Sequence, residues 1–392
     1  MENKKSYKNE IGFEAPIFII IFFGIFIYIG RIMGGTNMIK TMMNTGFDLL
    51  MNVCFYLMAV SVLAGGMAAI FSEFGVIALI NKGLSVIMKP VYDLPGASSL
   101  GMLNCFMSDN PAILTLAYDD NFRKYFKKYQ MPALTNLGTA FGMGLIIVTT
   151  MMGLSVPNAI HGAVVGFFGA VFGSIVSVRI MMIKTKKFYG TEEYVICKNV
   201  EPIPKNQRRV REGSIGSRFI QALLDGGKVG VDMGVAIIPG VVLICTFVIM
   251  LTNGVGEAGA YNGSANQGIG LLPVIGKKLS FVLTPLFGFS TPEAIAIPIT
   301  ALGSSGAAIG MVSDMASRGV INGNDIAVFT SICMCWSGYL STHIAMMDAL
   351  DTKEMTGHAI LSHTIGGLAG GVFAHIVWMI LFLSLIHISD GA

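Results

Sequence analysis

The chain of 392 residues is 53% hydrophobic and only 12% charged, with a formal net charge of +3 and a mean hydropathy of +0.69. Soluble globular domains carry about 25% charged residues, so this composition excludes that class and indicates a polytopic membrane protein. The sequence contains no nucleotide-binding motif, no nucleophile-elbow motif and no zinc-ligand spacing among its cysteines and histidines. We therefore expect no enzymatic activity, no cofactor and no metal centre.

The chain begins with a polar, lysine-rich leader that the positive-inside rule places in the cytoplasm. An apolar first span over residues 15–34 follows, and no small-residue cleavage site comes after it, which favours a retained helix over a signal peptide. Residues 1–46 are assigned to this leader and first helix. A short amphipathic stretch at 36–43 leads into a second span at 47–71, whose small residues in VLAGGMAAIF suit close helix packing.

The first interrupted segment follows a short helix. Residues 76–91 have a helical pattern that Pro90 and the following Asp-Leu-Pro-Gly stop, and this helix is expected to lie at the membrane interface. Residues 97–118 are long enough to cross the membrane, but Ser108-Asp109-Asn110-Pro111 interrupts them. Because proline disfavours helical backbone at the residue before it and suits the first turn of a new helix, we predict a re-entrant hairpin or a broken span.

A basic loop at 121–130 and two further spans at 135–152 and 158–182 complete the first half, so that residues 47–183 form one repeat plus a connecting helix. The longest polar loop, residues 184–218, is rich in lysine and arginine and divides the chain. A cytoplasmic position explains this charge more simply than nucleic-acid binding does.

The second half repeats the order of the first. Residues 219–347 hold the second repeat, and residues 348–392 hold a C-terminal helix and tail. The predicted elements are an amphipathic stretch at 219–228, a span at 229–251, an external loop at 252–268, a short helix at 271–287, a broken segment at 292–312 and spans at 326–347 and 361–385. The last residues, SLIHISDGA, resemble vector-derived sequence, and no function is assigned to them.

Residues 84–152 and 279–347 align with each other without a gap. Identical pairs at this constant offset include Leu84/Leu279, Pro90/Pro285, Asp119/Asp314, Arg123/Arg318, Thr135/Thr330 and Met152/Met347. The first break is flanked by a basic cytoplasmic loop and the second follows an external loop, so the two breaks are expected to enter from opposite faces. These observations predict an all-α polytopic membrane protein with inverted structural repeats and two broken or re-entrant helical segments, an arrangement typical of secondary transporters.

Asp109 is the charged group at the centre of the first break. Charged side chains at bilayer depth are costly and usually functional, and a carboxylate there suits Na⁺ coordination, proton relay or binding of a cationic or hydroxylated solute. Asp109 is therefore the candidate for holding a coupling ion, either Na⁺ or H⁺. A structural role as a cap for the next helix is the alternative. His343, near the inner end of a later span, is a second candidate for a proton relay.

The second break places Ser304, Ser305 and Gly306 where the first has its acidic Asp-Asn pair. Hydroxyls and free amides at a helix start suit solute oxygens or an anion, whereas small-residue packing is the alternative. Glu293, at the start of this segment, is either a solute-binding acid or a partner of the helix dipole. The predicted solute site comprises Asn104, Asp109, Asn110, Thr135, Asn136, Glu293, Ser304, Ser305, Gly306, Thr330 and Ser331. For the uncharged polar members, interhelical hydrogen bonding is the alternative.

Two motifs recur in both halves of the chain. LSVIMKPVYDLPG and LSFVLTPLFGFSTPEA each follow an apolar, glycine-rich span and precede an interrupted segment, SDNPA or GSSGAAIG. On these motifs, residues 50–155 and 229–347 resemble the nucleoside-recognition (gate) superfamily of membrane proteins, which includes concentrative nucleoside transporters, spore-maturation membrane proteins and gate regions of ferrous-iron transporters. The hairpin-tip glutamine–threonine–glutamate pattern of the nucleoside transporters is absent here, so the resemblance implies the architecture more than the cargo.

The expected function is H⁺- or Na⁺-coupled secondary transport of a small polar solute, with a nucleoside or related metabolite as the candidate. The alternative is a non-transport scaffold or regulatory membrane protein with the gate fold. Expected partners are the solute and the lipid bilayer, with no nucleic acid, and a homo-oligomer is left open. The resemblance and the basic loops imply a bacterial plasma (inner) membrane protein with a cytoplasmic N-terminus.

Overall fold

The computed structural model describes residues 12–110, 112–117, 120–196, 210–255 and 259–389. These ranges are helical and contain no β-strand, only an isolated bridge between Lys127 and Tyr194. The lysine-rich leader, Pro111, the middle of the basic loop and the end of the tail lie outside the described residues.

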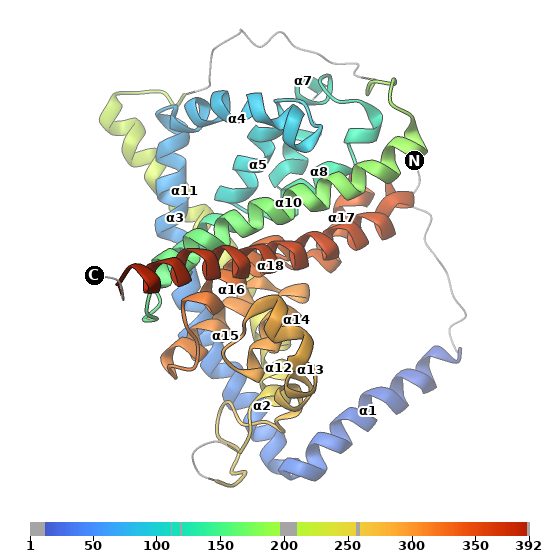
Figure 1. Ribbon diagram of the computed structural model, residues 1–392, viewed down its shortest axis with the longest axis vertical. Helices are drawn as coiled ribbons and strands as arrows, with labels where there is room; N and C mark the ends of the chain where they lie inside the picture. The colour runs from blue at the N-terminus through green and yellow to red at the C-terminus, as the bar shows by residue number, and fades with distance from the viewer. Residues whose placement is uncertain (1–11, 111, 118–119, 197–209, 256–258, 390–392) are drawn as a thin grey trace.

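Apolar helices account for most of the molecule. Four helices in the described ranges are long and apolar enough to cross a membrane, or up to six if each of two bent pairs counts as one span. The four are α1 (Glu14–Met33), Lys128–Met152, α10 (Ala159–Tyr189) and Lys353–Leu381. Helices satisfy every backbone hydrogen bond within themselves, which is why such segments can lie in lipid. The chain is an integral membrane protein. The first helix, α1, projects from the other helices (Figure 1), and its C-terminal part packs on α2 (Gly35–Asp48) and on Phe247 and Met250.

Each half contains one long helix with a π-helical turn in its course. In the first half α2 (Gly35–Asp48) continues through Leu49–Cys54 into α3 (Phe55–Glu73). The counterpart in the second half is α11 (Ile215–Pro239), which continues through Gly240–Cys245 into α12 (Thr246–Thr252). The amphipathic stretches expected at 36–43 and 219–228 are therefore not separate elements but the first turns of these long helices. The two π-helical turns pack against each other.

The α3 and α11 helices pack antiparallel, with their backbones in contact. A Cβ atom added to Gly65 would lie 2.5 Å from the carbonyl oxygen of Gly226, and one added to Gly226 would lie 2.2 Å from that of Gly65. At one end of the pair, Arg218 Nε donates to Glu73 Oε1 at 2.7 Å. The close helix packing predicted from the VLAGGMAAIF stretch is confirmed, because only glycine fits at this crossing.

A short helix bent away from its neighbour occurs in each half. The angle between Val62–Glu73 and α4 (Val76–Tyr92) is 80°, and that between α13 (Leu271–Phe287) and Pro292–Gly303 is 78°. An angle near 80° fits the interfacial position expected for α4. The two short helices lie at opposite ends of the molecule, as Figure 1 shows, and we call these ends the α4 face and the α13 face.

The two predicted interruptions are present. In the first half α5 (Ser98–Met107) and α6 (Ala112–Ala117) flank residues 108–110. In the second half the 3₁₀ turn Pro292–Ile295 and α14 (Ala296–Gly303) are followed, after a break at Ser304, by α15 (Ser305–Ser317). We call residues 108–110 the first tip and residues 304–306 the second tip.

Two further breaks occur where continuous spans at 135–152 and 326–347 were expected. The first span divides into α8 (Ala133–Phe141) and α9 (Gly144–Met152), and the second into α16 (Gly323–Cys335) and α17 (Tyr339–Ala349). Met143 and Gly338 adopt left-handed backbone with φ of 56° and 63°, which ends the preceding helix. The segment Lys128–Met152 is a candidate membrane span, as predicted, but each of the two predicted spans contains an internal break.

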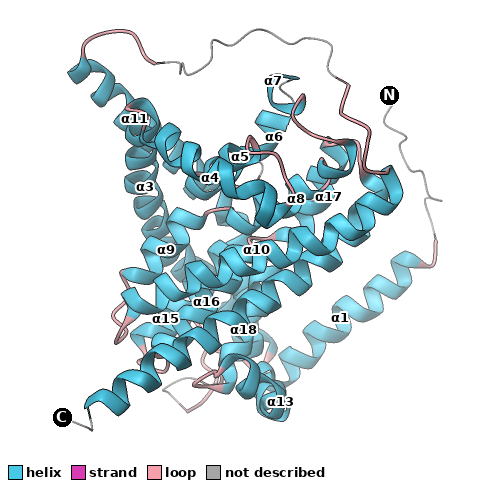
Figure 2. Cartoon of the chain, turned by 45° about the horizontal axis from the view of Figure 1, so that its top comes forward, coloured by secondary structure: helices cyan, strands magenta, loops and turns pink. Residues whose placement is uncertain are grey.

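The centre of the molecule is a bundle of α8, α10, α16 and α18 (Thr356–Ser389), seen side by side in Figure 2. Helices α10 and α18 pack antiparallel through small residues, because a Cβ on Gly173 would lie 2.6 Å from the Gly366 carbonyl oxygen and one on Gly366 would lie 2.6 Å from that of Gly173. The remaining short elements are α7 (Asp120–Arg123) and the 3₁₀ turns Lys128–Gln130 and Lys353–Met355. Since equivalent helices of the two halves, α3 with α11 and α10 with α18, run antiparallel, the predicted inverted repeat is confirmed.

Candidate functional site

Asn110 in the first tip joins the breaks of both repeats. Its side chain is buried, and Nδ2 donates to the Ser337 carbonyl at 2.6 Å and to Thr342 Oγ1 at 3.4 Å. Its Oδ1 atom is buried, has no hydrogen-bond partner among the described residues, and lies against Gly142, where an added Cβ would come within 1.4 Å of it. A glycine in the α8–α9 break therefore makes room for the amide that reaches the α16–α17 break.

The second tip packs on the same α16–α17 break. Ser304 caps α15 by accepting a hydrogen bond from the Ala307 amide at 3.2 Å, and Ser305 Oγ donates to the Cys333 carbonyl at 2.5 Å. The Gly338 amide donates to the carbonyl of Ala301 at 3.2 Å. The hydroxyls of this tip are thus used in the fold, and Gly306 is buried beside them.

A pocket of about 530 Å³ lies between the first tip and the α3–α11 pair. Its polar end is formed by Asn104, Ser108 and Asp109, and its apolar walls come from small residues of α3 and α11. The complete lining is Gly65, Ala68, Ala69, Ser72, Asn104, Met107, Ser108, Asp109, Ala112, Gly226 and Val229. Pockets of about 300–1,000 Å³ with apolar walls and a few convergent polar groups are typical small-molecule sites. We call this cavity the tip pocket.

Asp109 supplies the charge in the tip pocket. Its Oδ1 atom accepts a hydrogen bond from the Asn110 amide at 2.7 Å, so the carboxylate caps the tip itself. Among the described residues, no lysine, arginine or histidine forms an ion pair with it. A carboxylate in an apolar cavity without a cationic partner is suited to binding a cation, a proton or a solute hydroxyl.

The polar residues predicted on the neighbouring spans lie in the packed bundle and do not line the tip pocket. Asn136 Nδ2 donates to Ser177 Oγ and to Ser362 Oγ, each at 2.8 Å, and Thr330 Oγ1 donates to the Ile326 carbonyl at 2.6 Å. Thr135 and Ser331 are completely buried in the same bundle. His343 is also buried, with its ring centroid 4.6 Å from that of His363 and 5.4 Å from that of Tyr339.

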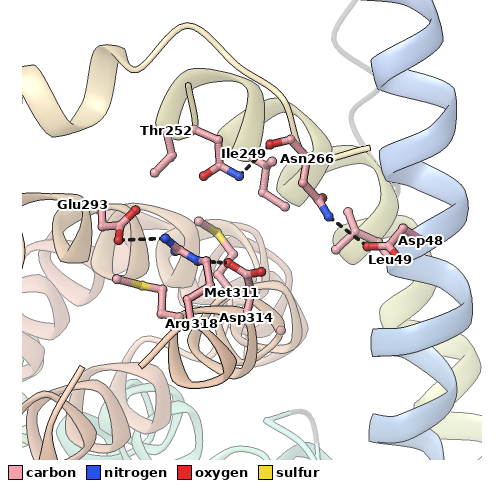
Figure 3. Close-up of a pocket in the computed structure, with 12 residues that line it drawn as sticks. Asp48, Leu49, Ile249, Thr252, Asn266, Glu293, Met311, Asp314 and Arg318 are labelled. Carbon is pink, nitrogen blue, oxygen red and sulfur yellow. Dashed lines mark hydrogen bonds and ion pairs between the residues drawn. The ribbon is translucent and has the colours of Figure 1, made fainter. Parts of the chain in front are cut away.

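Glu293 lines a second, smaller pocket of about 40 Å³ (Figure 3), which shares no lining residue with the tip pocket. Arg318 closes this pocket, since Nη1 donates to Glu293 Oε1 at 3.1 Å and Nε donates to Asp314 Oδ2 at 3.0 Å. On its other side Asn266 Nδ2 donates to Asp48 Oδ2 at 3.0 Å. The structure therefore brings Asn104, Asp109 and Asn110 together but separates Glu293 from them.

Several lining residues of the tip pocket carried no signal in the sequence. Ala68, Ala69 and Val229 are ordinary apolar residues of long helices, and only their position opposite the first tip makes them part of a cavity. Gly65 belongs to the small-residue stretch already identified, which predicted close packing but not a pocket. Ser72 differs from its apolar neighbours, but one serine near a helix end indicates no site.

Comparison with known proteins finds similar folds among solved transporter structures. No family model matches the sequence, and no curated protein matches it. Solved structures of CNTnw, a concentrative nucleoside transporter, are similar over most of both chains. The inward-facing, substrate-bound state gives a TM-score of 0.52 at 15% identity and covers 92% of this chain and 84% of that one. Two variants in outward-facing states give TM-scores of 0.54 and 0.53 at 13% and 15% identity, with 92% of this chain and 84% and 85% of theirs covered. The chain therefore shares the fold of this transporter.

Proposed function

We propose that the protein is a secondary transporter of a small polar solute, with a nucleoside or related metabolite as the substrate class. The tip pocket carries this proposal, because it combines room for a small molecule with one acidic and two neutral polar side chains at a helix break. The shared fold with CNTnw, solved in inward-facing and outward-facing states, supports it. The pocket also favours transport over a scaffold, whose interior needs no such cavity.

Solute recognition is assigned to the polar end of the tip pocket. The Asn104 amide and the Asp109 carboxylate can hydrogen-bond the hydroxyls or ring nitrogens of a solute, and the small residues of α3 and α11 leave space for its flat apolar faces. Asn110, Ser304, Ser305 and Gly306 hold the two tips on the breaks. In this proposal Thr135, Asn136, Thr330 and Ser331 stabilise the packing of the central bundle and do not contact the solute.

The coupling ion is assigned to the first tip. Asp109 can accept a proton or bind Na⁺, whereas the unpartnered Oδ1 atom of Asn110 can bind a metal cation but takes no proton at neutral pH. Because Nδ2 of the same side chain donates to Ser337, the oxygen must point toward Gly142. Because these two adjacent residues offer a carboxylate and an amide oxygen, we propose Na⁺ rather than H⁺ as the coupling ion.

Ligand-induced stabilisation of the purified protein tests this function. Uridine and adenosine are each added with Na⁺ and without it, and each is expected to raise the Tm of the wild-type protein. At a hundredfold excess of ligand over Kd, binding stabilises the folded state by about 2.7 kcal/mol. Asp109→Asn should lose most of this shift, while Asp351→Asn, which changes an exposed carboxyl outside the pocket, should keep it. An equal Tm shift in both variants would show that Asp109 does not contribute to the site. The absence of a Tm shift with both nucleosides would contradict the proposed substrate class.

A further inference from the structure

An apolar groove of about 500 Å³ lies on the other side of α5 from the tip pocket. It is bounded by α4, α5 and α10, and its walls are almost entirely hydrocarbon. Representative lining residues are Ile80, Leu84 and Ile87 from α4, Leu103 and Phe106 from α5, and Phe168 from α10. Tyr92, a polar lining residue, already pairs with Ser174, their hydroxyl oxygens being 2.7 Å apart. The groove therefore fits an apolar chain and offers no polar group in need of a partner.

The outer edge of the groove faces the surface that lipid covers. Ile80, Ile87 and Phe168 are 42%, 46% and 57% exposed although they are large apolar side chains. An exposed apolar surface of this kind on a membrane protein contacts acyl chains. A lipid chain can thus enter the groove directly from the bilayer, without crossing water.

Basic side chains stand at the end of the groove where α4 stops. Arg179 Nε donates to the carbonyl of Val91 at 2.7 Å, and the same guanidinium contacts the Pro90 carbonyl. Lys89, on the last turn of α4, has a side chain that is 64% exposed and forms an ion pair with Asp93, and Lys186 Nζ lies 2.6 Å from the same carboxylate. Three cations and one carboxylate give this rim a net charge of +2. A lipid with an anionic headgroup is favoured there, at about 1 kcal/mol per basic side chain.

We propose that this groove binds an acyl chain of an anionic phospholipid, with the headgroup at Arg179, and that the bound lipid sets the position of α5. Leu103 and Phe106 on one face of α5 line the groove, while Asn104 on the other face lines the tip pocket. Phe106 also packs edge-on against Phe167 at 5.7 Å, and a Cβ on Gly144 would lie 2.3 Å from its ring. Filling the groove therefore fixes the helix that carries the first tip.

Brominated phospholipids test the site by quenching a tryptophan placed in it. The full chain carrying Phe168→Trp is reconstituted in phosphatidylcholine containing increasing fractions of dibrominated phosphatidylglycerol or dibrominated phosphatidylcholine, and the fluorescence of the parent chain is subtracted. Half-maximal quenching is expected at a roughly five-fold lower fraction of the anionic lipid, the preference that one basic side chain provides. Phe281→Trp, 76% exposed on α13 away from the groove, should show no preference. Ile87→Trp serves as a second reporter if the first variant misfolds.

Charge variants separate a headgroup site from general lipid contact. Adding Arg179→Gln to the reporter chain should abolish the preference for phosphatidylglycerol, and Arg179→Lys should retain part of it. Equal quenching by both lipids at both reporter positions means bulk lipid contact only and overturns the proposal. Because the measurement contains no solute, its failure would leave the proposed transport function untouched, and failure of nucleoside binding would leave the lipid site untouched.

Discussion

Gly142 and Asn110 form the tightest residue pair at the centre of the molecule. The backbone of Gly142 has an ordinary φ of −61°, so the glycine is required by space and not by backbone strain. The neighbouring amide occupies the volume that any Cβ would need, 1.4 Å from Asn110 Oδ1. The sequence alone contains no signal for this pair, since glycine is common throughout membrane helices.

We predict that Gly142→Ala destabilises the protein and weakens solute binding. The added methyl group must push the Asn110 amide away from Ser337, and overpacking of this kind costs about 1–3 kcal/mol. Gly83→Ala is the matched control, because nothing lies within 4 Å of a Cβ at that position of α4. In thermal unfolding and in nucleoside titration, only Gly142→Ala should show a lower Tm and a lower affinity for nucleoside. An unchanged Gly142→Ala protein would show that Asn110 does not occupy this space.

Asn110→Ala is predicted to weaken the dependence of transport on Na⁺. The substitution removes the buried Oδ1 atom and leaves the Ser337 carbonyl without its donor, which costs about 1–3 kcal/mol of stability. The Na⁺ concentration for half-maximal uptake should rise at least tenfold, which corresponds to about 1.4 kcal/mol. Asn52→Ala is the control for the loss of an asparagine, because Asn52 is exposed and its side-chain amide donates a hydrogen bond to Asp48. Unaltered Na⁺ dependence would shift the coupling role to Asp109 alone.

Among the elements, the α3–α11 pair forms a wall of the tip pocket and depends on two glycines. Gly226→Ala should separate these helices, because its Cβ would lie 2.2 Å from a backbone oxygen that cannot rotate away. The adjacent Gly227→Ala is the control, since the nearest atom to its Cβ is a Val62 methyl at an ordinary 3.5 Å. We expect Gly226→Ala to lower the free energy of unfolding by about 1–3 kcal/mol and therefore to lower Tm. Gly227→Ala should leave both quantities unchanged. Equal Tm values would contradict the backbone contact.

Asp93 links the end of α4 to α10 and to the 3₁₀ turn Lys128–Gln130 through an ion pair and hydrogen bonds. Burial alone would raise the pKa of Asp93, but ion pairs to Lys186 and Lys89 outweigh it and hold the pKa below its ordinary value of 3.8. Tyr129 adds a hydrogen bond to the carboxylate at 3.2 Å, and Gln130 donates to the Asp93 carbonyl at 2.6 Å. The carboxylate therefore stabilises the folded state only when it is ionised.

The sign of this linkage gives a pH prediction. A carboxyl with a lowered folded-state pKa contributes stability above its unfolded pKa of about 4, and that contribution is lost as the pH falls through the folded value. Asp93→Asn keeps a side chain that tolerates the left-handed backbone at this position, φ 59°, but removes the charge. Its Tm should be lower than that of the wild type at pH 7, and the difference should close below pH 4. A difference that persists in acid would mean that packing, not charge, is the cause.

The breaks show which elements could be predicted from the sequence. The first tip was predictable because an acidic residue and a proline interrupt an apolar segment, and the second because a serine-glycine pair stands at the same offset. The α8–α9 and α16–α17 breaks have neither charge nor proline. Met143 turns left-handed directly after Gly142, which packs on Asn110 of the first tip, and Asn110 lies more than 30 residues earlier in the chain. Likewise, Asn136 and Ser331 were predictable as buried polar groups, but helix periodicity does not tell a cavity from a packed bundle.

At the scale of the whole molecule, the tip pocket lies at the α3–α11 crossing, where Gly65 and Gly226 line it. The small pocket is lined by Asp48 and Thr252, which belong to the helices α2 and α12 that continue this pair beyond its π-helical turns. Arg318 closes the small pocket while the tip pocket is open and large. Inverted repeats place equivalent tips on either side of one centre, which is the arrangement that alternating access requires.

Uptake into proteoliposomes tests the central claim most directly. The purified chain is reconstituted, an inward Na⁺ gradient or an inward H⁺ gradient is imposed, and accumulation of radiolabelled uridine and adenosine is measured for the wild type and for Asp109→Asn. We predict accumulation above the external concentration with the Na⁺ gradient, its collapse when the gradient is dissipated, and its loss in Asp109→Asn. Accumulation no higher than in protein-free liposomes, under either gradient and with both nucleosides, would contradict it.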